Sequence, residues 1–530
     1  MDSHPQETMS IQNNRTVTAF LFTVIALLLP ACGGGSSQPK PRPNVVFVVV
    51  DTLRGDVLTD PENRYSTPNL DALISEGVHF PKTFAHAPLT LPSHTAMFSS
   101  RPPIETVVFN NGQTVPNELP LLSEWMTRFG YETRAVTSLG TLWAPKPESG
   151  LWRGFADYNL DYWHMSQAED STTRMQKSLD ASNPERPLFL FAHYSDPHEP
   201  YNSHGEVDHQ ATIRHNGNVI ATVSTSEMSF WHHTMTLDPG VHTFEITSDH
   251  NFKVRQFQAM NPTGAKRWSE LDWEVGKRVK AIKTARLTLS QTSDGPVSRD
   301  LRLWINDAPG HDAIRDRYAK EVAYVDQWIG NLISDLKQRG LYEESLIVFT
   351  SDHGESLGEH GRVGHANGLT DPHIHVPLIV KLPKSDPRRG QLAASHKEIV
   401  SHADLTPTIL ELSALPPLPG QLGKSLLHPK DTVHFAQTHR PEAREDQLCL
   451  RDDEFKMIYL PETDEFQFFD LTKDPGELKN VFATRQNERA DWVTTLKSLA
   501  QTCKERAESG YTEDASKQAD LEALGYGGGE

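Results

Sequence analysis

Residues 44–52 read NVVFVVVDT, an unbroken run of β-branched and aromatic residues that ends in an acid and a threonine. Strands of a parallel sheet are covered on both faces, so they show continuous apolar runs rather than an alternation. The run therefore predicts a central strand of an α/β fold. Asp51 follows at its carboxyl end, which is the edge at which open α/β sheets bind ligands.

Two later stretches repeat this arrangement of apolar strand and polar loop, PLFLFAHYSDPHEPY at 187–201 and SLIVFTSDHGESLGEHG at 345–361. The acid and imidazole side chains that follow these strands are His193, Asp196, His198, Asp352 and His353. An amphipathic stripe from Tyr318 to Leu336, closed by Gly340, predicts a long helix before the last strand. Parallel strands would deliver these polar side chains to one edge of the sheet.

Asp51, Asp352 and His353 are candidate ligands of a metal ion. Two carboxylates and one imidazole form a mixed oxygen and nitrogen set, which suits zinc or manganese better than calcium. The alternative is that Asp51 caps a turn and that His353 is a packed core residue.

Thr90 stands at the start of a predicted helix in APLTLPSHTAMFSSRPP, residues 87–103. A helix start favours anions, so a hydroxyl held there beside a divalent cation would be an activated nucleophile for a phosphoryl or sulfuryl group. The alternative is a helix N-cap, a role that threonine fills well.

The 530-residue chain has 51 lysines and arginines against 70 acids, a net charge of −19, which argues against nucleic-acid binding. At the N-terminus, Arg15 precedes the apolar run VTAFLFTVIALLLPA, typical of a secretory signal. Cys32 follows in a lipobox-like context, and a Gly/Ser/Pro stretch after it would form a flexible tether. We expect an exported bacterial lipoprotein, anchored by lipid on Cys32 to a membrane of the cell envelope and facing the periplasm.

The interval 203–310 has a different pattern. ATIRHNGNVIATVS alternates around Asn216-Gly217, the strongest short hairpin signal, and HTMTLDPGVHTFEIT predicts a second hairpin around DPG. With ARLTLSQ and RDLRLWIND as further strands, the interval predicts an inserted antiparallel sandwich. Beyond residue 425, short alternating runs and a helix near 484–505 predict a small α+β subdomain. Cys449 and Cys503 could pair or stay free.

A series of segments resembles, in order, the signatures of the sulfatase family within the alkaline phosphatase superfamily. These segments are PNVVFVVVDTLRGD, TPNLDALISEGVHF, APLTLPSHTAMFSSRPP, HYSDPHEPY, TSDHGESLGEHG, VGHANGLTDPHIHVPLIV, SHADLTPTIL, FFDLTKDPGELKN and LEALGY. The resemblance implies a central, mostly parallel sheet flanked by helices, with the β module inserted and a C-terminal subdomain added. The implied division is 1–32 signal segment, 33–42 linker, 43–202 and 311–424 catalytic domain, 203–310 β module, and 425–530 C-terminal subdomain.

Position by position, the resemblance makes Asp51 and Asp352 metal ligands. It places His198 near the bound ester, where it could protonate the leaving oxygen, and His365 near the anion. Arg54 could hold an anionic oxygen or pair with an acid. His193 and Asp196 could complete a second metal site, although their spacing does not match two-metal relatives well.

The chain departs from the family at four places. Thr52 replaces a second metal aspartate, and His353 replaces an asparagine. Thr90 occupies the position of the cysteine or serine that sulfatases oxidise to formylglycine, and His94 replaces the arginine of the same motif. The set Asp51, Thr90, Asp352 and His353 resembles that of phosphoethanolamine transferases and lipoteichoic acid synthases, in which threonine also binds the metal.

We therefore expect a metal-dependent hydrolase of phosphate or sulfate esters in which metal-bound Thr90 attacks, with phosphoesters favoured because threonine cannot expel sulfate as formylglycine does. The substrate would be a small-molecule, glycan or lipid-linked ester. Two alternatives stay open: a sulfatase that works without formylglycine, and a catalytically silent envelope protein that binds anionic glycans. The oligomeric state and the organic half of the ester are not legible in the sequence.

Overall fold

A computed structural model describes residues 42–510 with short gaps at 143–148, 161–164, 200, 202–209, 226–228, 250–251, 261–278, 282, 292–293, 308–310, 429–432 and 440–445. The predicted signal segment, with Cys32, lies outside these residues. Within the described ranges, every helix is either too short or too polar to cross a bilayer.

The centre of the molecule is a seven-stranded sheet with the order β2-β19-β15-β1-β6-β4-β5. Its strands are β2 (Val78–His79), β19 (Leu378–Lys381), β15 (Ser345–Ser351), β1 (Asn44–Val50), β6 (Leu188–Tyr194), β4 (Glu132–Val136) and β5 (Asp157–Asn159). From β15 to β5 all neighbours run parallel, whereas β19 runs antiparallel to β15 and to β2 on its other side. The predicted α/β fold with a mostly parallel sheet is confirmed.

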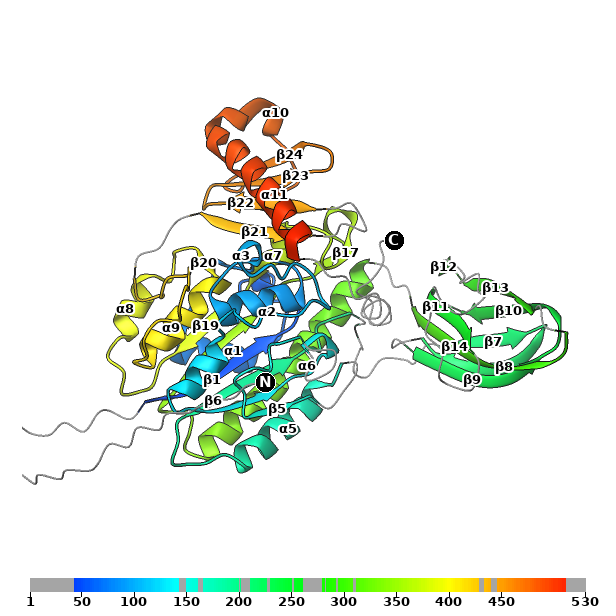
Figure 1. Cartoon of the computed structure of the whole chain (residues 1–530), viewed down its shortest axis with the longest axis horizontal. Helices are drawn as coiled ribbons and strands as arrows, with labels where there is room; N and C mark the ends of the chain where they lie inside the picture. Colours follow the sequence, from blue (N-terminus) through cyan, green and yellow to red (C-terminus); the bar gives the residue numbers. More distant parts are fainter. Residues whose placement is uncertain are drawn as a thin grey trace, which may run out of the picture. The chain divides into compact units, whose positions relative to one another are not determined.

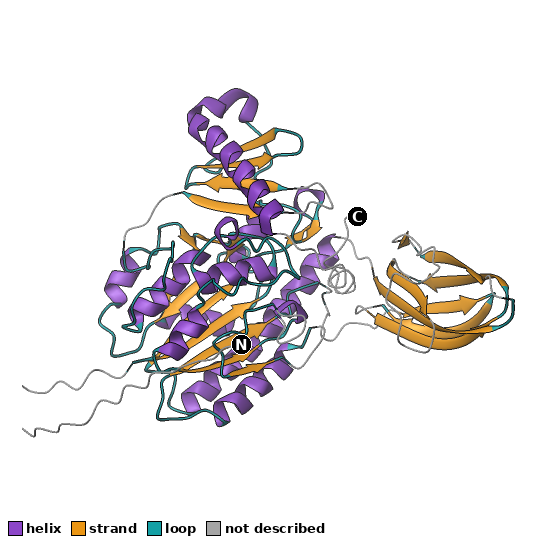
Figure 2. Cartoon of the chain, viewed as in Figure 1, coloured by secondary structure: helices purple, strands orange, loops and turns teal. Residues whose placement is uncertain are grey.

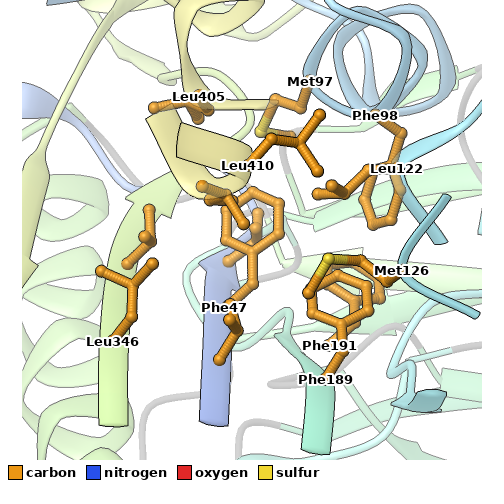
Figure 3. Packing of buried hydrophobic residues seen from close by; sticks show 14 of the residues in the cluster. Phe47, Met97, Phe98, Leu122, Met126, Phe189, Phe191, Leu346, Leu405 and Leu410 are labelled. Atoms are coloured by element: carbon orange, nitrogen blue, oxygen red, sulfur yellow. The ribbon is translucent and has the colours of Figure 1, made fainter. Parts of the chain in front are cut away.

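Alternate residues of β1 face two separate cores, as its continuous apolar run predicts. Val45, Phe47 and Val49 pack with α2 (Thr90–Ser99), α4 (Leu122–Arg128) and α9 (Leu405–Leu412). Figure 3 shows Phe47 among Met97, Phe98, Leu405 and other residues of this core. The intervening valines pack with α1 (Pro68–Glu76), α5 (Ala168–Asp180) and α6 (His311–Gln338). Helices thus cover both faces of the sheet (Figures 1 and 2).

Helix α6 is the long helix predicted from the apolar stripe. The six stripe residues are buried: Tyr318, Val322, Val325, Ile329, Leu332 and Leu336. Gly340 has a positive φ of 70°, a conformation in which glycine carries no steric penalty, so it suits the end of the helix. Asp326 also receives the backbone N–H groups of Asn69 and Leu70 and so holds the start of α1.

The inserted segment forms two four-stranded sheets, β13-β10-β7-β8 and β12-β11-β14-β9. Their strands are β7 (Gln210–His215), β8 (Asn218–Ser224), β9 (Ser229–Leu237), β10 (Gly240–Ser248), β11 (Phe252–Met260), β12 (Val279–Ala281), β13 (Thr284–Gln291) and β14 (Val297–Asp307). Both sheets contribute to one apolar core, and the β7–β8 hairpin turns at Asn216-Gly217 as predicted.

The prediction of a second hairpin, around DPG, is wrong. β9 pairs with β14, and β10 pairs with β7 and β13 in the other sheet. The sequence DPG therefore connects the two sheets of the sandwich instead of closing a hairpin. The alternation of apolar residues is the same in both cases, because it reports only that one face of each strand is buried.

The C-terminal part forms the sheet β21 (His434–Thr438), β22 (Gln447–Arg451), β23 (Phe455–Leu460) and β24 (Glu465–Asp470), followed by α10 (Phe482–Arg485) and α11 (Ala490–Gly510). One face of the sheet packs on α11. Lys456 of β23 lies between Asp371 and Glu477, at 2.8 and 2.7 Å, and so ties this sheet to α7 (Asp371–Ile374). Cys449 and Cys503 are buried and unpaired.

Candidate metal and ester site

The parallel pairing of β1 with β15 brings the two acids together. Val50 is opposite Ser351 in the register, so the next residues, Asp51 and Asp352, leave neighbouring strands at the same edge. Neighbouring strands lie about 4.8 Å apart, so the two side chains share one small volume. Both acids are fully buried, and Oδ1 of Asp352 accepts the backbone N–H groups of Thr52 and His353 at 3.2 and 2.8 Å.

Asp51, Asp352 and His353 form a cluster in which one ligand atom from each residue lies within 4.8 Å of the others. Nε2 of His353 is 3.5 Å from Oδ2 of Asp352 and 3.9 Å from Oδ1 of Asp51. The other ring nitrogen, Nδ1, donates to the carbonyl of Gly354 at 3.0 Å, which leaves the Nε2 lone pair for a ligand.

Three buried atoms of this cluster have no hydrogen-bond partner among the described residues: Oδ1 of Asp51, Oδ2 of Asp352 and Nε2 of His353. Buried polar atoms are normally satisfied, so unpartnered acceptors in one cluster indicate a missing positive partner. The donor set of two carboxylates and one imidazole fits a divalent ion such as zinc or manganese.

Burial controls the ionisation of the cluster. It raises the pKa of Asp51 well above the ordinary value, and the negative charge of Asp352 raises it further. It also raises the pKa of Asp352 to about 8 and lowers the pKa of His353 well below its usual range. Without a cation, the acids therefore favour their protonated forms, whereas a divalent ion would favour the carboxylates that bind it.

The side chain of Thr90 does not cap its helix. Thr90 is the first residue of α2, and Leu89 at the N-cap makes no side-chain cap bond. The cap bond comes from elsewhere, because Oδ1 of Asn111 accepts the N–H of Leu91 at 2.8 Å. Thr90 Oγ1 instead lies 3.4 Å from Oδ2 of Asp51 and is fully buried. Its hydroxyl therefore belongs to the acid and imidazole cluster.

His365 lies beside the cluster, and His198 lies against His365. The ring centres of His365 and His353 are 4.7 Å apart, and those of His365 and His198 are 4.8 Å apart. Nδ1 of His365 lies 3.2 Å from Oε1 of Glu355. We did not single out Glu355 from the sequence, although it lies two residues after His353, within the quoted segment.

Arg54 is occupied by acids. Its guanidinium pairs with Asp56 at 2.6 Å and with Glu359 at 2.9 Å, and it also donates to the carbonyl of Glu355. Of the two roles left open by the sequence, the geometry favours pairing with acids over holding an ester oxygen. The pKa of Arg54 is raised well above its ordinary value, because its acidic partners outweigh its burial.

Two further histidines lie next to the cluster. His94 Nδ1 donates to the carbonyl of Thr90 at 2.8 Å and is 3.6 Å from Asp352 Oδ2. His193 Nε2 is 4.0 Å from Asp51 Oδ2, and its Nδ1 lies 2.9 Å from Ser138 Oγ. Asp196, considered with His193 for a second metal site, instead accepts the N–H of Ala168 at the start of α5.

Thr52, at the position of a second acid in the family pattern, points its hydroxyl to the carbonyl of Asp51 at 2.7 Å. Its φ of 58° lies in the left-handed region, which is rare for a β-branched residue. The surrounding bonds hold this strained turn, since the N–H of Thr52 binds Asp352 and its carbonyl accepts the hydroxyl of Tyr318.

Comparisons with known proteins identify the family of the chain. The sulfatase family profile matches residues 43–414, and the profile of the C-terminal region of N-sulphoglucosamine sulphohydrolase matches residues 358–505. An N-acetylglucosamine-6-O-sulfatase of Bacteroides thetaiotaomicron is 22% identical over 94% of this chain and 92% of its own. Arylsulfatase K of Xenopus laevis is 25% identical over 89% of this chain and 85% of its own.

Solved structures share the fold. A phosphonate monoester hydrolase of Agrobacterium radiobacter has a TM-score of 0.58 at 20% identity, covering 87% of this chain and 96% of its own. A protein crystallised with its substrate D-glucosamine-2-N,6-O-disulfate has a TM-score of 0.58 at 17% identity, covering 90% and 99%. The fold and the family profile thus define an ester hydrolase of the alkaline phosphatase superfamily. The chain belongs to the sulfatase family, whose members are metal-dependent.

Because Asn111 and not Thr90 caps helix α2, the two residues should contribute differently to the stability of the metal-free chain. Asn111→Leu removes the cap and leaves the buried N–H of Leu91 unpaired, so it should lower the free energy of unfolding by about 1–3 kcal/mol. Thr90→Val, a change of similar kind at the start of the same helix, should cost less. Denaturant unfolding of both variants in the presence of a chelator measures the order; a larger loss for Thr90→Val would make Thr90 the cap.

Proposed function

We propose that this sulfatase-family chain hydrolyses phosphate esters, with Thr90 as the nucleophile. The observation that carries the proposal is the position of the buried Thr90 hydroxyl, 3.4 Å from Oδ2 of Asp51. This hydroxyl does not cap helix α2, because Asn111 accepts the N–H of Leu91. A threonine used only for structure at a helix start would be expected to cap it. Here the hydroxyl lies instead beside two acids and an imidazole, each of which has one buried atom without a hydrogen-bond partner among the described residues.

Asp51, Asp352 and His353 would hold a divalent ion, with Thr90 beside it. Such an ion supplies positive charge that lowers the pKa of a nearby hydroxyl and offsets charge on the transferred group. The chain's own residues do the rest: strands β1 and β15 fix the acids, α2 positions Thr90, and the carbonyl of Gly354 fixes the tautomer of His353.

In the proposed reaction, Oγ1 of Thr90 forms a bond to phosphorus as the bond from phosphorus to the leaving oxygen breaks. The hydroxyl proton of Thr90 passes to solvent. His198 is neutral in the free chain, because burial lowers its pKa to about 4. The negative charge of the bound ester would raise that pKa, so that His198 takes a proton from solvent and donates it to the leaving oxygen. Water then attacks phosphorus and the bond to Thr90 Oγ1 breaks. Inorganic phosphate leaves with the oxygen of that water, and a proton that the water gives up restores the hydroxyl of Thr90.

The choice of phosphorus over sulfur rests on the absence of a convertible cysteine or serine. Hydrated formylglycine releases sulfate by collapsing to its aldehyde, whereas a threonine ester must be cleaved by attack at phosphorus or sulfur. The phosphonate monoester hydrolase among the similar structures supports phosphoryl chemistry on this fold. The names of the relatives that act on sulfated sugars support the alternative, a sulfatase without formylglycine, and suggest a glycan as the organic half.

Turnover of paired substrates tests the proposal. The full chain, loaded with zinc or manganese, should cleave an aryl phosphate ester faster than the matching aryl sulfate. Thr90→Ala should lower kcat/KM at least about 10³-fold, because it removes the nucleophile, while Thr90→Ser keeps a hydroxyl and should retain part of the activity.

Thr95→Val is the matched control, since Thr95 is a buried threonine of the same helix whose hydroxyl donates to the carbonyl of Leu91. It should leave turnover within a few-fold of wild type. Faster Thr90-dependent cleavage of the sulfate would establish the sulfatase alternative. Metal binding without Thr90-dependent turnover of either ester would overturn the proposal and favour a silent glycan-binding protein.

We also propose that the chain is exported and anchored by lipid on Cys32, on the basis of the apolar segment and the lipobox-like residues before it. Cells given a labelled fatty acid should incorporate the label into the full chain. Cys32→Ser should abolish incorporation, and a labelled serine variant would contradict this assignment.

A further inference from the structure

A cavity lies where β21 meets the segment after β3 (Thr83–Phe84), and its lining includes none of the residues of the ester site. Its lining includes His86, Ser401, Asp404, Lys424 and His434. His86 and His434 are 6% and 3% exposed. The mechanism proposed above uses neither of them.

Each of the two histidines donates one ring N–H to a backbone carbonyl of the opposite segment. Nδ1 of His86 donates to Phe435 at 2.7 Å, and Nε2 of His434 donates to Ala85 at 3.0 Å. A carbonyl can only accept, so these contacts fix both tautomers. Burial lowers the pKa of both imidazoles and keeps them neutral.

The remaining nitrogens, Nε2 of His86 and Nδ1 of His434, therefore carry bare lone pairs. Neither atom has a hydrogen-bond partner among the described residues, and both are buried. Two unpartnered acceptors in adjacent rings are unexpected in a cavity wall that serves only for packing, because each unsatisfied buried acceptor costs about 1–3 kcal/mol. The arrangement suits a ligand that accepts electron pairs.

The hydrogen bonds of the two rings match those of histidine ligands in metal sites. A metal-bound imidazole characteristically donates its other N–H to a carbonyl or carboxylate, as both rings do here. The ring centres are 4.9 Å apart. Two imidazoles that share one zinc ion at about 2.0–2.1 Å have ring centres about 5 Å apart.

The cavity also contains charge of both signs. The Asp404 carboxylate accepts the N–H groups of Ser401 and Lys424, both at 2.8 Å, which holds it in place on the cavity wall. Its charge favours a cation near His86, and Lys424 lines the same cavity. The two imidazoles and the Asp404 carboxylate suit a divalent ion whose remaining positions are filled by water, and their attraction opposes the repulsion from the Lys424 ammonium.

We infer that His86 and His434 form a second site for a divalent transition-metal ion of the zinc class, separate from the Asp51 cluster. The ion would join the segment after β3 to β21 and so fasten the C-terminal sheet to the central sheet domain. This inference is independent of the proposed ester hydrolysis, since none of its residues takes part in that reaction.

Metal counting tests the inference on the full chain. After treatment with a chelator and dialysis against low micromolar Zn²⁺, wild type should bind two ions. His86→Asn with His434→Gln should bind one, because these side chains can keep the donors to Phe435 and Ala85 but lose the bare nitrogens. Asp352→Asn with His353→Asn should also bind one. His428→Asn, at an exposed histidine paired with Glu411, should still bind two.

A second measurement is needed in case the His86→Asn, His434→Gln chain does not fold. Zn²⁺ should raise the thermal midpoint of the Asp352→Asn, His353→Asn chain, and adding His434→Gln alone should remove that rise. Two results would each overturn the site: unchanged stoichiometry in the His86→Asn, His434→Gln chain, or an equal rise in midpoint with and without His434.

Discussion

The burial of two carboxylates at the ends of adjacent parallel strands is the constraint on which the rest of the site depends. The register of β1 on β15 places Asp51 and Asp352 side by side, fully buried, with their mutual repulsion unscreened by water. Burying two unpaired charges is costly, so the fold needs a cation there or must protonate the acids. The raised pKa values of both acids express this conflict.

The residues around the two acids do not neutralise their charge but orient the side chains of the cluster. The left-handed turn at Thr52 sends a hydroxyl to the carbonyl of Asp51 and leaves the Asp51 carboxylate without that bond. The carbonyl of Gly354 fixes the tautomer of His353, and Asn111 caps α2 so that Thr90 need not. These bonds thus leave the Asp51 carboxylate, Nε2 of His353 and the Thr90 hydroxyl free of other local roles at the cluster. Strain of this kind persists when the surrounding structure holds it and is characteristic of functional sites.

The sequence could predict the central strands, α6 and the edge at which the acids meet, because continuous apolar runs and strand ends have few structural solutions. It could not decide between cap and nucleophile for Thr90, since the deciding partner, Asn111, lies 21 residues away and carries no pattern of its own. Glu355 was not singled out, and His193 was paired with Asp196 instead of the Asp51 cluster, because the neighbours of these residues are set by tertiary packing. The DPG connection was mistaken for a hairpin, since strand alternation reports burial but not which sheet a strand joins.

If Thr90 is the nucleophile, it must become covalently modified during turnover. The direct measurement is mass spectrometry of the peptide containing Thr90 after acid quenching of the metal-loaded chain during turnover of an aryl phosphate ester. The account predicts a phosphoryl group on Thr90 that is present only with substrate and is absent in Thr90→Ala. Steady turnover with an unmodified Thr90, undiminished in Thr90→Val, would contradict it.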